Sequence, residues 1–156
     1  MKEEQGGAKA NREGLRLQEI VLGILNTYKY EEQPNSFFRL ACHLKQPIFS
    51  QQFDIGKGIY QTDCKCDFII YHPEKHPQTL VIECKWQASS GSTDEKFPYM
   101  VANIKERFST RTIIVIDGDG ARKGGIKWLK NQVDQKYLIG VFSLSEFTKW
   151  ANAGNL

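Results

Sequence analysis

The sequence predicts an α/β fold, a three-layer α/β/α sandwich around a mixed central sheet, and three observations lead to it. Residues 66–71, 80–87 and 111–117 contain runs rich in Ile and Val that need cover on both faces of a sheet. A loop with two prolines separates the first two runs, as expected between paired strands. A helical pattern separates the last two runs, which is typical of a crossover between parallel strands.

Composition places the chain among soluble globular proteins. It has 156 residues, of which 40% are hydrophobic and 25% charged, with a net charge of +3. We expect a flexible tail over residues 1–9 and a single domain over residues 10–156. Neither a membrane span nor a signal peptide is visible, so we expect a cytoplasmic protein with four free thiols, and the spacing of its cysteines is not that of a standard zinc site.

The first predicted helix runs from Asn11 to Thr27. Apolar residues at helical spacing form one stripe: Leu17, Ile20, Val21, Ile24 and Tyr28. Leu15 and Leu22 lie on the far side with Glu19 between them, which favours a semi-buried position for this acid over a solvated one. A helix that is apolar on two sides is either covered on both or packed against a partner chain.

Residues 29–60 allow more than one interpretation. Residues 31–36 form a turn-rich break, and residues 37–44 fit either a strand or a short helix. Residues 47–60 contain two β-like pieces, which we interpret as a first strand or a small hairpin. A Gly-Lys-Gly sequence around Lys57 then gives a flexible basic tip.

The second half of the chain alternates helices and strands. A helix capped by Ser92, Thr93 or Asp94 should bury one stripe, formed by Phe97, Val101, Ile104 and Phe108. The strand at 111–117 follows, and then a turn in which Asp117 and Asp119 are interpreted as turn residues rather than as a second metal site.

Three further elements complete the chain. A helix is predicted from residue 122 to about residue 135, and a strand over residues 137–142. Ser143 or Ser145 should cap the last helix, which ends near Ala151.

Charged residues interrupt the two apolar runs in the middle of the chain, residues 66–71 and 80–87. If residues 66–71 and 80–87 form a hairpin centred near Lys75, Asp67 lies opposite Glu83 at about 5 Å. Lys85 lies on the same strand face as Glu83, about 6.6 Å along the strand. Two carboxylates and an ammonium group therefore converge at one end of a buried hairpin.

This convergence needs a counter-charge. Two carboxylates held a few ångströms apart repel each other and resist leaving water. A divalent cation removes the conflict, and a site with few protein oxygen ligands suits Mg²⁺, which keeps several waters. The alternative is an ion-paired strand end in which Lys85 bridges both acids.

These residues resemble the motif of the PD-(D/E)XK nuclease superfamily, and most closely that of its small restriction-endonuclease-like members. Asp67 matches the acid that starts one strand, and Glu83-Cys84-Lys85 matches the Glu-x-Lys that ends the next. The order of elements, from the first helix to at least the strand ending near Asp117, matches the αβββαβ core of that fold. Cys66 stands where the motif has proline.

The resemblance implies a set of metal ligands. Asp67, Glu83 and the main-chain carbonyl of Cys84 would bind one or two Mg²⁺ ions, with Mn²⁺ as a substitute. The metal would activate a water for in-line attack at phosphorus, leaving a 5′-phosphate and a 3′-hydroxyl.

It also implies roles for three further residues. Lys85 would offset charge in the transition state, since neighbouring acids oppose the depressed pKa that a base needs. Gln87 would orient the water or bind a phosphate oxygen. Glu19 fits the acid that many members bring from the first helix, and would act through a metal-bound water or by positioning other groups.

A DNA substrate needs cationic contacts. Arg122, Lys123, Lys127 and Lys130 on one predicted helix, and Lys57 in its glycine tip, are candidates for phosphate contacts. The alternative for the helix is an ordinary solvated face.

The predicted function is a Mg²⁺-dependent endodeoxyribonuclease, site-specific and of restriction or defence type. Cutting both strands suggests a homodimer with DNA as the partner, and no organic cofactor or membrane is expected. One alternative is a catalytically silent nucleic-acid-binding module on the same scaffold. The other is a repair, junction-resolving or homing nuclease of the same superfamily.

Overall fold

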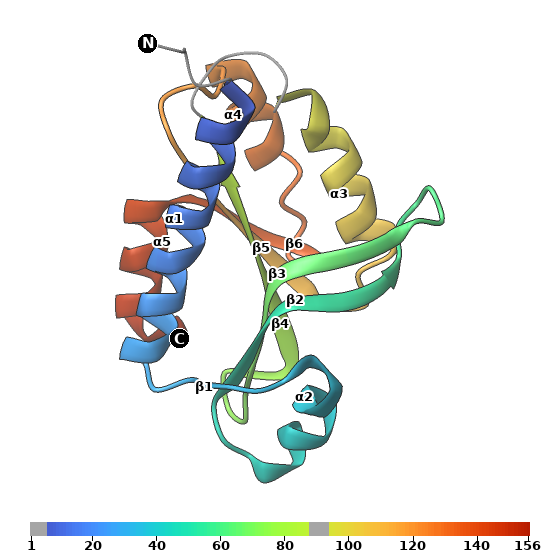
Figure 1. Cartoon of the computed structure of the whole chain (residues 1–156), viewed down its shortest axis with the longest axis vertical. Coiled ribbons are helices and arrows are strands. Elements are labelled where there is room, and N and C mark those ends of the chain that lie inside the picture. The colour runs from blue at the N-terminus through green and yellow to red at the C-terminus, as the bar shows by residue number, and fades with distance from the viewer. Residues whose placement is uncertain (1–5, 88–93) are drawn as a thin grey trace.

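The molecule is a three-layer α/β/α sandwich, as predicted, and its computed structural model describes residues 6–87 and 94–156 (Figure 1). The described strands are β1 (Glu31–Glu32), β2 (Ile48–Lys57), β3 (Asp63–His72), β4 (His76–Trp86), β5 (Arg111–Asp117) and β6 (Leu138–Ser143). The described helices are α1 (Gly6–Thr27), α2 (Asn35–Ala41), α3 (Phe97–Glu106), α4 (Lys123–Lys130) and α5 (Leu144–Trp150). Short helical turns are η1 (Cys42–Leu44), η2 (Asp94–Lys96) and η3 (Ala151–Asn155).

The strands form one mixed sheet in the order β1-β2-β3-β4-β5-β6. Strands β2, β3 and β4 pair antiparallel, whereas β4, β5 and β6 pair parallel, and β1 adds in parallel to β2. The crossover prediction is confirmed, because α3 connects β4 to its parallel neighbour β5.

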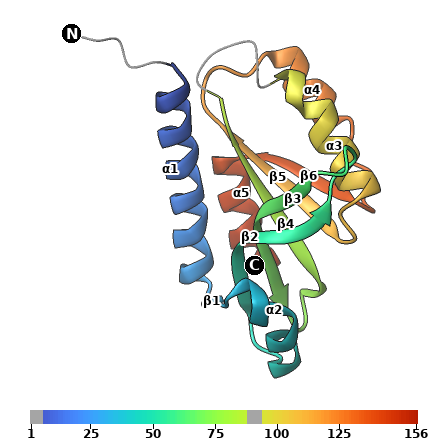
Figure 2. The same cartoon turned by 45° about the vertical axis from the view of Figure 1, so that its right-hand side comes forward.

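Helices cover both faces of the sheet, and Figure 2 shows α1 and α5 on one side with α3 and α4 on the other. The core under α1 and α5 includes Leu17, Val21, Leu25, Phe68, Ile70, Ile82, Val115 and Phe147. The core under α2, α3 and α4 includes Phe38, Phe53, Ile69, Val81, Phe97, Ile104, Ile114 and Leu129. Both faces of β3, β4 and β5 are therefore apolar because both are covered.

Helix α1 begins at Gly6, five residues before the predicted start at Asn11, and ends at Thr27 as predicted. Its buried stripe repeats every four residues through Leu17, Val21 and Leu25. Ile20, predicted to be part of the stripe, is 46% exposed because it lies beside the stripe rather than in it.

The region from residue 29 to residue 60 folds into elements that the sequence left open. Residues 35–41 form helix α2, which starts after Pro34, and Phe38 and Ala41 anchor it in the core. Residues 48–57 form one continuous strand rather than two pieces, and this strand pairs with β3.

The later elements follow the prediction with shifted ends. The predicted stripe of α3 is buried, and Pro98 sits in the first turn of the helix, where proline is tolerated. Helix α4 is shorter than predicted and ends at Lys130. Ser143 caps α5 through a reciprocal capping box with Glu146, whereas the cap candidates Ser92 and Thr93 lie outside the described residues.

The part of the chain that the structure describes contains no helix with the length and hydropathy needed to cross a lipid bilayer.

Gly118 should be essential to the end of β4. Its φ is +102°, and a Cβ there would lie 2.3 Å from the main-chain oxygen of Gln87. We expect Gly118→Ala to lower the free energy of unfolding by about 3 kcal/mol or more, because overpacking adds to left-handed strain. Chemical denaturation measures this change.

Gly154→Ala is the matched control, because Gly154 also has a positive φ (+89°) but a Cβ there would meet no atom within 4 Å. This variant should lose only about 1–2 kcal/mol, the cost of the backbone conformation alone. Equal losses in the two variants would contradict the steric argument.

Candidate active site

The β3–β4 hairpin sets the register of the site. Phe68 pairs with Ile82 and Ile70 with Leu80, so paired residue numbers add up to 150, as predicted. The next position in this register sets Asp67 opposite Glu83. Beyond it β3 continues along β2 while β4 continues along β5, so the two acids lie where β3 and β4 separate.

At this point in β2 and β3, the side chains that face one core change to facing the other. Phe49 and Phe53 are four positions apart and would share a face in a regular strand. Instead Phe49 belongs to the core under α1, and Phe53 to the core under α2 and α3. On β3 the same change occurs between Phe68 and Cys66, which leaves Asp67 at the turning point.

Three donors hold the Asp67 carboxylate. Gln18 of α1 donates its side-chain amide to Oδ1 at 3.0 Å, and Gln52 of β2 donates to the same oxygen at 3.3 Å. The main-chain N–H of Cys84 donates to Oδ2 at 2.7 Å. Gln52 reaches the carboxylate from a left-handed backbone conformation, with φ +47°. Side chains from two elements and the backbone of β4 therefore fix one acid.

Glu83 is a buried carboxylate whose charge is only partly compensated. Only 5% of the residue is exposed, and Lys85 Nζ lies 3.3 Å from Oε2. Burial raises the pKa of Glu83 to about 7, with Asp67 adding to the rise and Lys85 opposing it. Within the described residues, Oε1 is buried without a hydrogen-bond partner. A buried carboxylate oxygen in this state is costly unless a cation or a proton satisfies it.

Lys85 remains a cation in this setting. Burial alone would lower the pKa of Lys85, but the carboxylates of Glu83 and Asp67 outweigh it and raise the pKa above its ordinary value. The side chain is 36% exposed, so its ammonium group reaches from the buried Glu83 toward solvent.

A cavity of about 410 Å³ opens over Glu83 and Lys85. Its walls come from α1, β3, β4, η2, α3 and the segment that follows α3: Asn11, Cys64, Lys65, Glu83, Lys85, Trp86, Lys96, Phe97, Tyr99, Met100, Asn103 and Phe108. We call this cavity the Glu83 cleft. Three lysines and a single carboxylate line it, so the cleft favours an anionic ligand.

Glu19 is exposed, so the expectation of a semi-buried acid is wrong. Two positions before Val21 on α1, it points about 160° away from the buried stripe, given 100° per residue. Gln18, its neighbour, makes the contact with Asp67 instead. The catalytic role of Glu19 stays a prediction that competes with one for Gln18, because Gln18 is the α1 side chain that contacts Asp67 in the structure.

Gln87 is buried, does not line the Glu83 cleft, and contacts η2 at the start of α3. Its amide donates to Asp94 Oδ1 at 2.8 Å, and Arg122 Nε lies 3.5 Å from Asp94 Oδ2. The main-chain N–H of Gly120 donates to the Gln87 carbonyl. These contacts join the end of β4 to the starts of α3 and α4.

The predicted DNA contacts lie at two places. Arg122 and the lysines of α4 are exposed at the same end of the sheet as the site, and Lys130 pairs with Glu146 at 3.3 Å. Lys57 is exposed at the end of β2 and pairs with Asp63 at 2.5 Å. Within the described residues, Lys123 and Lys127 have no ion-pair partner.

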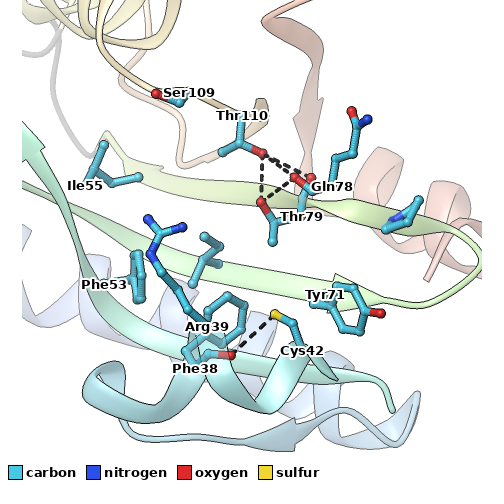
Figure 3. Close-up of a pocket in the computed structure, with 12 residues that line it drawn as sticks. Phe38, Arg39, Cys42, Phe53, Ile55, Tyr71, Gln78, Thr79, Ser109 and Thr110 are labelled. Carbon is cyan, nitrogen blue, oxygen red and sulfur yellow. Dashed lines mark hydrogen bonds between the residues drawn. The ribbon is translucent and has the colours of Figure 1, made fainter. Parts of the chain in front are cut away.

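A second cavity of about 340 Å³ lies at the start of β4, between α2 and the strand ends (Figure 3). The hydroxyl of Thr110 donates toward the carbonyls of Gln78 and Thr79 at 3.1 Å. Figure 3 shows Thr110 pointing toward these two residues in the lining of the cavity. Its lining includes Arg39 but no carboxylate or histidine. It therefore lacks the groups that metal-assisted hydrolysis needs.

The comparison with protein families decides the assignment. A family model described as "PD-(D/E)XK nuclease superfamily domain" matches residues 9–155. The chain belongs to the PD-(D/E)XK nuclease superfamily. Searches of curated proteins and of solved structures gave no significant match.

Membership of the PD-(D/E)XK superfamily gives the chain its general chemistry. It implies nuclease activity on a nucleic acid, and PD-(D/E)XK nucleases generally use divalent metals. Cys66, where the motif has proline, is fully buried and pairs with Phe53 in the β2–β3 ladder. A small buried thiol thus fills the position as part of the core.

The residues present fit a divalent cation. The buried Oε1 of Glu83 has no hydrogen-bond partner among the described residues, and the Asp67 carboxylate, which accepts the N–H of Cys84, adds to the rise in the pKa of Glu83. No group of three or more His, Cys, Asp or Glu in residues 6–87 and 94–156 could hold a metal. Two carboxylates can hold a divalent cation that keeps several of its waters.

Sequence reasoning missed three residues that contact the candidate site. Gln18 and Gln52 orient Asp67, and Asp94 holds Gln87. The signal for Gln18 was its place one residue after buried Leu17, which puts it at the edge of the sheet-facing stripe. Gln52 carried no comparable signal, because its contact depends on a backbone conformation that glutamine rarely adopts.

The raised pKa of Glu83 predicts how metal-free protein responds to pH. Between about pH 4.5 and 7 the folded state binds a proton at Glu83 that the unfolded state releases, so stability should fall as the pH rises through this window. We expect a loss of about 2–3 kcal/mol between pH 5 and 8 in EDTA, measured by urea unfolding.

Glu83→Gln should remove this dependence, because the amide does not titrate. Glu95→Gln, at an exposed acid of η2, is the matched control and should keep the wild-type dependence. The same pH profile in Glu83→Gln and the wild type would show that Glu83 does not carry the effect.

Proposed function

We propose that this protein is a Mg²⁺-dependent endonuclease that hydrolyses phosphodiester bonds of DNA, site-specifically and in a restriction or defence role. The observation that carries the proposal is the meeting of Asp67, Glu83 and Lys85 where β3 and β4 separate, at a cleft with a cationic lining. Free thiols at all four cysteines fit action in the reducing cytoplasm.

Three groups would hold the metal. They are the carboxylates of Asp67 and Glu83 and the main-chain carbonyl of Cys84. The N–H of Cys84 faces Asp67, and in a strand the carbonyl of the same residue faces the same neighbour. When bound, a divalent cation would polarise the scissile phosphate and lower the pKa of an attacking water.

The protein's own groups prepare the site for a phosphate. Lys85, kept protonated by the neighbouring acids, would stabilise the negative charge that develops on the phosphate oxygens in the transition state. Gln18 and Gln52 hold Asp67 in one orientation, so little reorganisation is needed when the substrate binds.

Helix α4 provides a path for the DNA backbone. Its exposed Lys123 and Lys127 lie one helical turn apart, and the Gln87–Asp94–Arg122 contacts fix the start of the helix at the end of β4. Phosphates bound by these lysines would run toward the Glu83 cleft. Cleavage of both strands would require two sites, which we place in a homodimer.

The first test is cleavage of supercoiled plasmid with Mg²⁺. We expect the wild type to cut, EDTA to stop cleavage, and Mn²⁺ to restore it. Asp67→Ala and Lys85→Ala should each lose activity at least 100-fold, because each removes charge from the reacting centre. Gel assays of nicked and linear product measure the loss.

Lys149→Ala, an exposed lysine on α5 at the other face of the sheet, is the control for Lys85 and should cut like the wild type. If the wild type leaves varied DNAs intact, or if both site variants cut as well as the wild type, the proposed function is wrong. Sequencing the ends of products from a complex DNA pool then reports whether cleavage is site-specific.

A neighbouring pair on α1 tests the orientation of Asp67. Gln18→Ala should lower the cleavage rate about 10-fold, because loss of a group that positions a ligand typically costs 10- to 100-fold. Glu19→Ala should stay within about twofold of the wild type, since Glu19 points to solvent. If Glu19→Ala lowered the cleavage rate more than Gln18→Ala, the catalytic role on α1 would belong to Glu19.

A further inference from the structure

The loop between β2 and β3, residues 58–62, is fixed against α3. The N–H of Gly58 donates to the Thr62 carbonyl at 2.9 Å and closes the loop. The buried side chain of Asn103 on α3 accepts the N–H of Ile59 at 2.8 Å. Figures 1 and 2 both show this tip beside α3. The loop is therefore held in place although it lies at the end of a long hairpin.

This loop presents an aromatic ring to solvent. Tyr60 stacks on Tyr99 of α3, with ring centroids 4.9 Å apart and an interplanar angle of 25°. Tyr60 is 72% exposed, the highest exposure of any large apolar side chain in the described residues. Since Tyr99 covers only one face of the Tyr60 ring, the other face is open to a ligand.

The stack stands at the wall of the Glu83 cleft. Tyr99 and Asn103, which carry the ring and the loop, both line that cleft together with Glu83. Lys65 and Lys96 line the same cleft and are exposed. An open aromatic face, cationic side chains and the phosphate-cleaving groups thus belong to one continuous surface.

We propose that Tyr60 stacks an unpaired nucleobase of the DNA strand whose phosphate enters the Glu83 cleft. The inference rests on the proposed function and adds to it a preference for DNA sites at which one nucleotide at the cleavage position is unpaired. Lys65 and Lys96 contact the phosphates that flank that nucleotide.

The chemistry of stacking separates unpaired from paired bases. Every nucleobase has a π-face that an aromatic side chain can cover, whatever the sequence. In a duplex that face is already stacked on its neighbours, and exposing it costs a few kcal/mol. A preformed, open tyrosine therefore adds affinity for single-stranded or unpaired positions and little for an intact duplex.

The test is binding in EDTA, which prevents cleavage, with fluorescently labelled single-stranded DNA, blunt duplex, and duplex carrying an unpaired nucleotide. Tyr60→Ala should weaken binding of the single strand and of the unpaired site about 5- to 150-fold, the range for loss of one stacked base. Blunt duplex binding should change less than twofold. Tyr60→Phe should retain the wild-type affinities, because it keeps the ring.

A base analogue gives a second readout. The fluorescence of 2-aminopurine at the unpaired position should be quenched on binding to the wild type and to Tyr60→Phe but not to Tyr60→Ala. Phe37→Ala removes another exposed ring, 40% exposed on α2 at the far end of the sheet, and should match the wild type. The midpoint of thermal unfolding of Tyr60→Ala should also equal that of the wild type, since the ring is on the surface.

Three outcomes would overturn the inference. Tyr60→Ala could weaken single-stranded and duplex binding equally, or leave both unchanged. It could instead change the oligomeric state, which would make the ring a subunit contact. Each of these results leaves plasmid cleavage, and with it the proposed function, standing. Failure of the wild type to bind any of the DNAs overturns both.

Discussion

The structure depends on one electrostatic constraint, the burial of the Glu83 carboxylate beside Asp67. Burial raises the pKa of Glu83 to about 7, so the site holds a proton or needs a cation at neutral pH. Lys85 offsets part of the charge from 3.3 Å, yet one oxygen of Glu83 has no hydrogen-bond partner in the described residues. An apolar pair would make a more stable strand end, so the cost has its explanation in function.

The surrounding fold serves to hold this pair in place. Strands β2 and β3 turn over at Gln52 and Asp67, and the β3–β4 ladder ends where Asp67 accepts the N–H of Cys84. Helix α1 closes one side through Gln18, and Gly118 lets the following loop pack against the end of β4. Each contact comes from a different segment, so the site exists only in the folded chain.

Local patterns predicted the parts of the fold that local physics controls. Alternation of side chains predicted the pairing of β3 with β4, in which paired residue numbers add up to 150. The helical period predicted the buried stripe of α3, and side-chain chemistry predicted the Ser143 cap. The left-handed Gln52 and the helical choice for residues 35–41 depend on tertiary contacts, so no window of sequence indicates them. Glu19 misled because two flanking leucines suggested burial, whereas Leu15 is itself 59% exposed.

The central claim is that Asp67 and Glu83 share a divalent cation, and calorimetric titration with Mg²⁺ or Mn²⁺ tests it most directly. The wild type should bind the ion, and Glu83→Gln, which keeps the shape of the side chain but removes its charge, should lose that binding. Absence of metal uptake by the wild type, or equal uptake by Glu83→Gln, would contradict the account and favour a strand end stabilised by Lys85 alone.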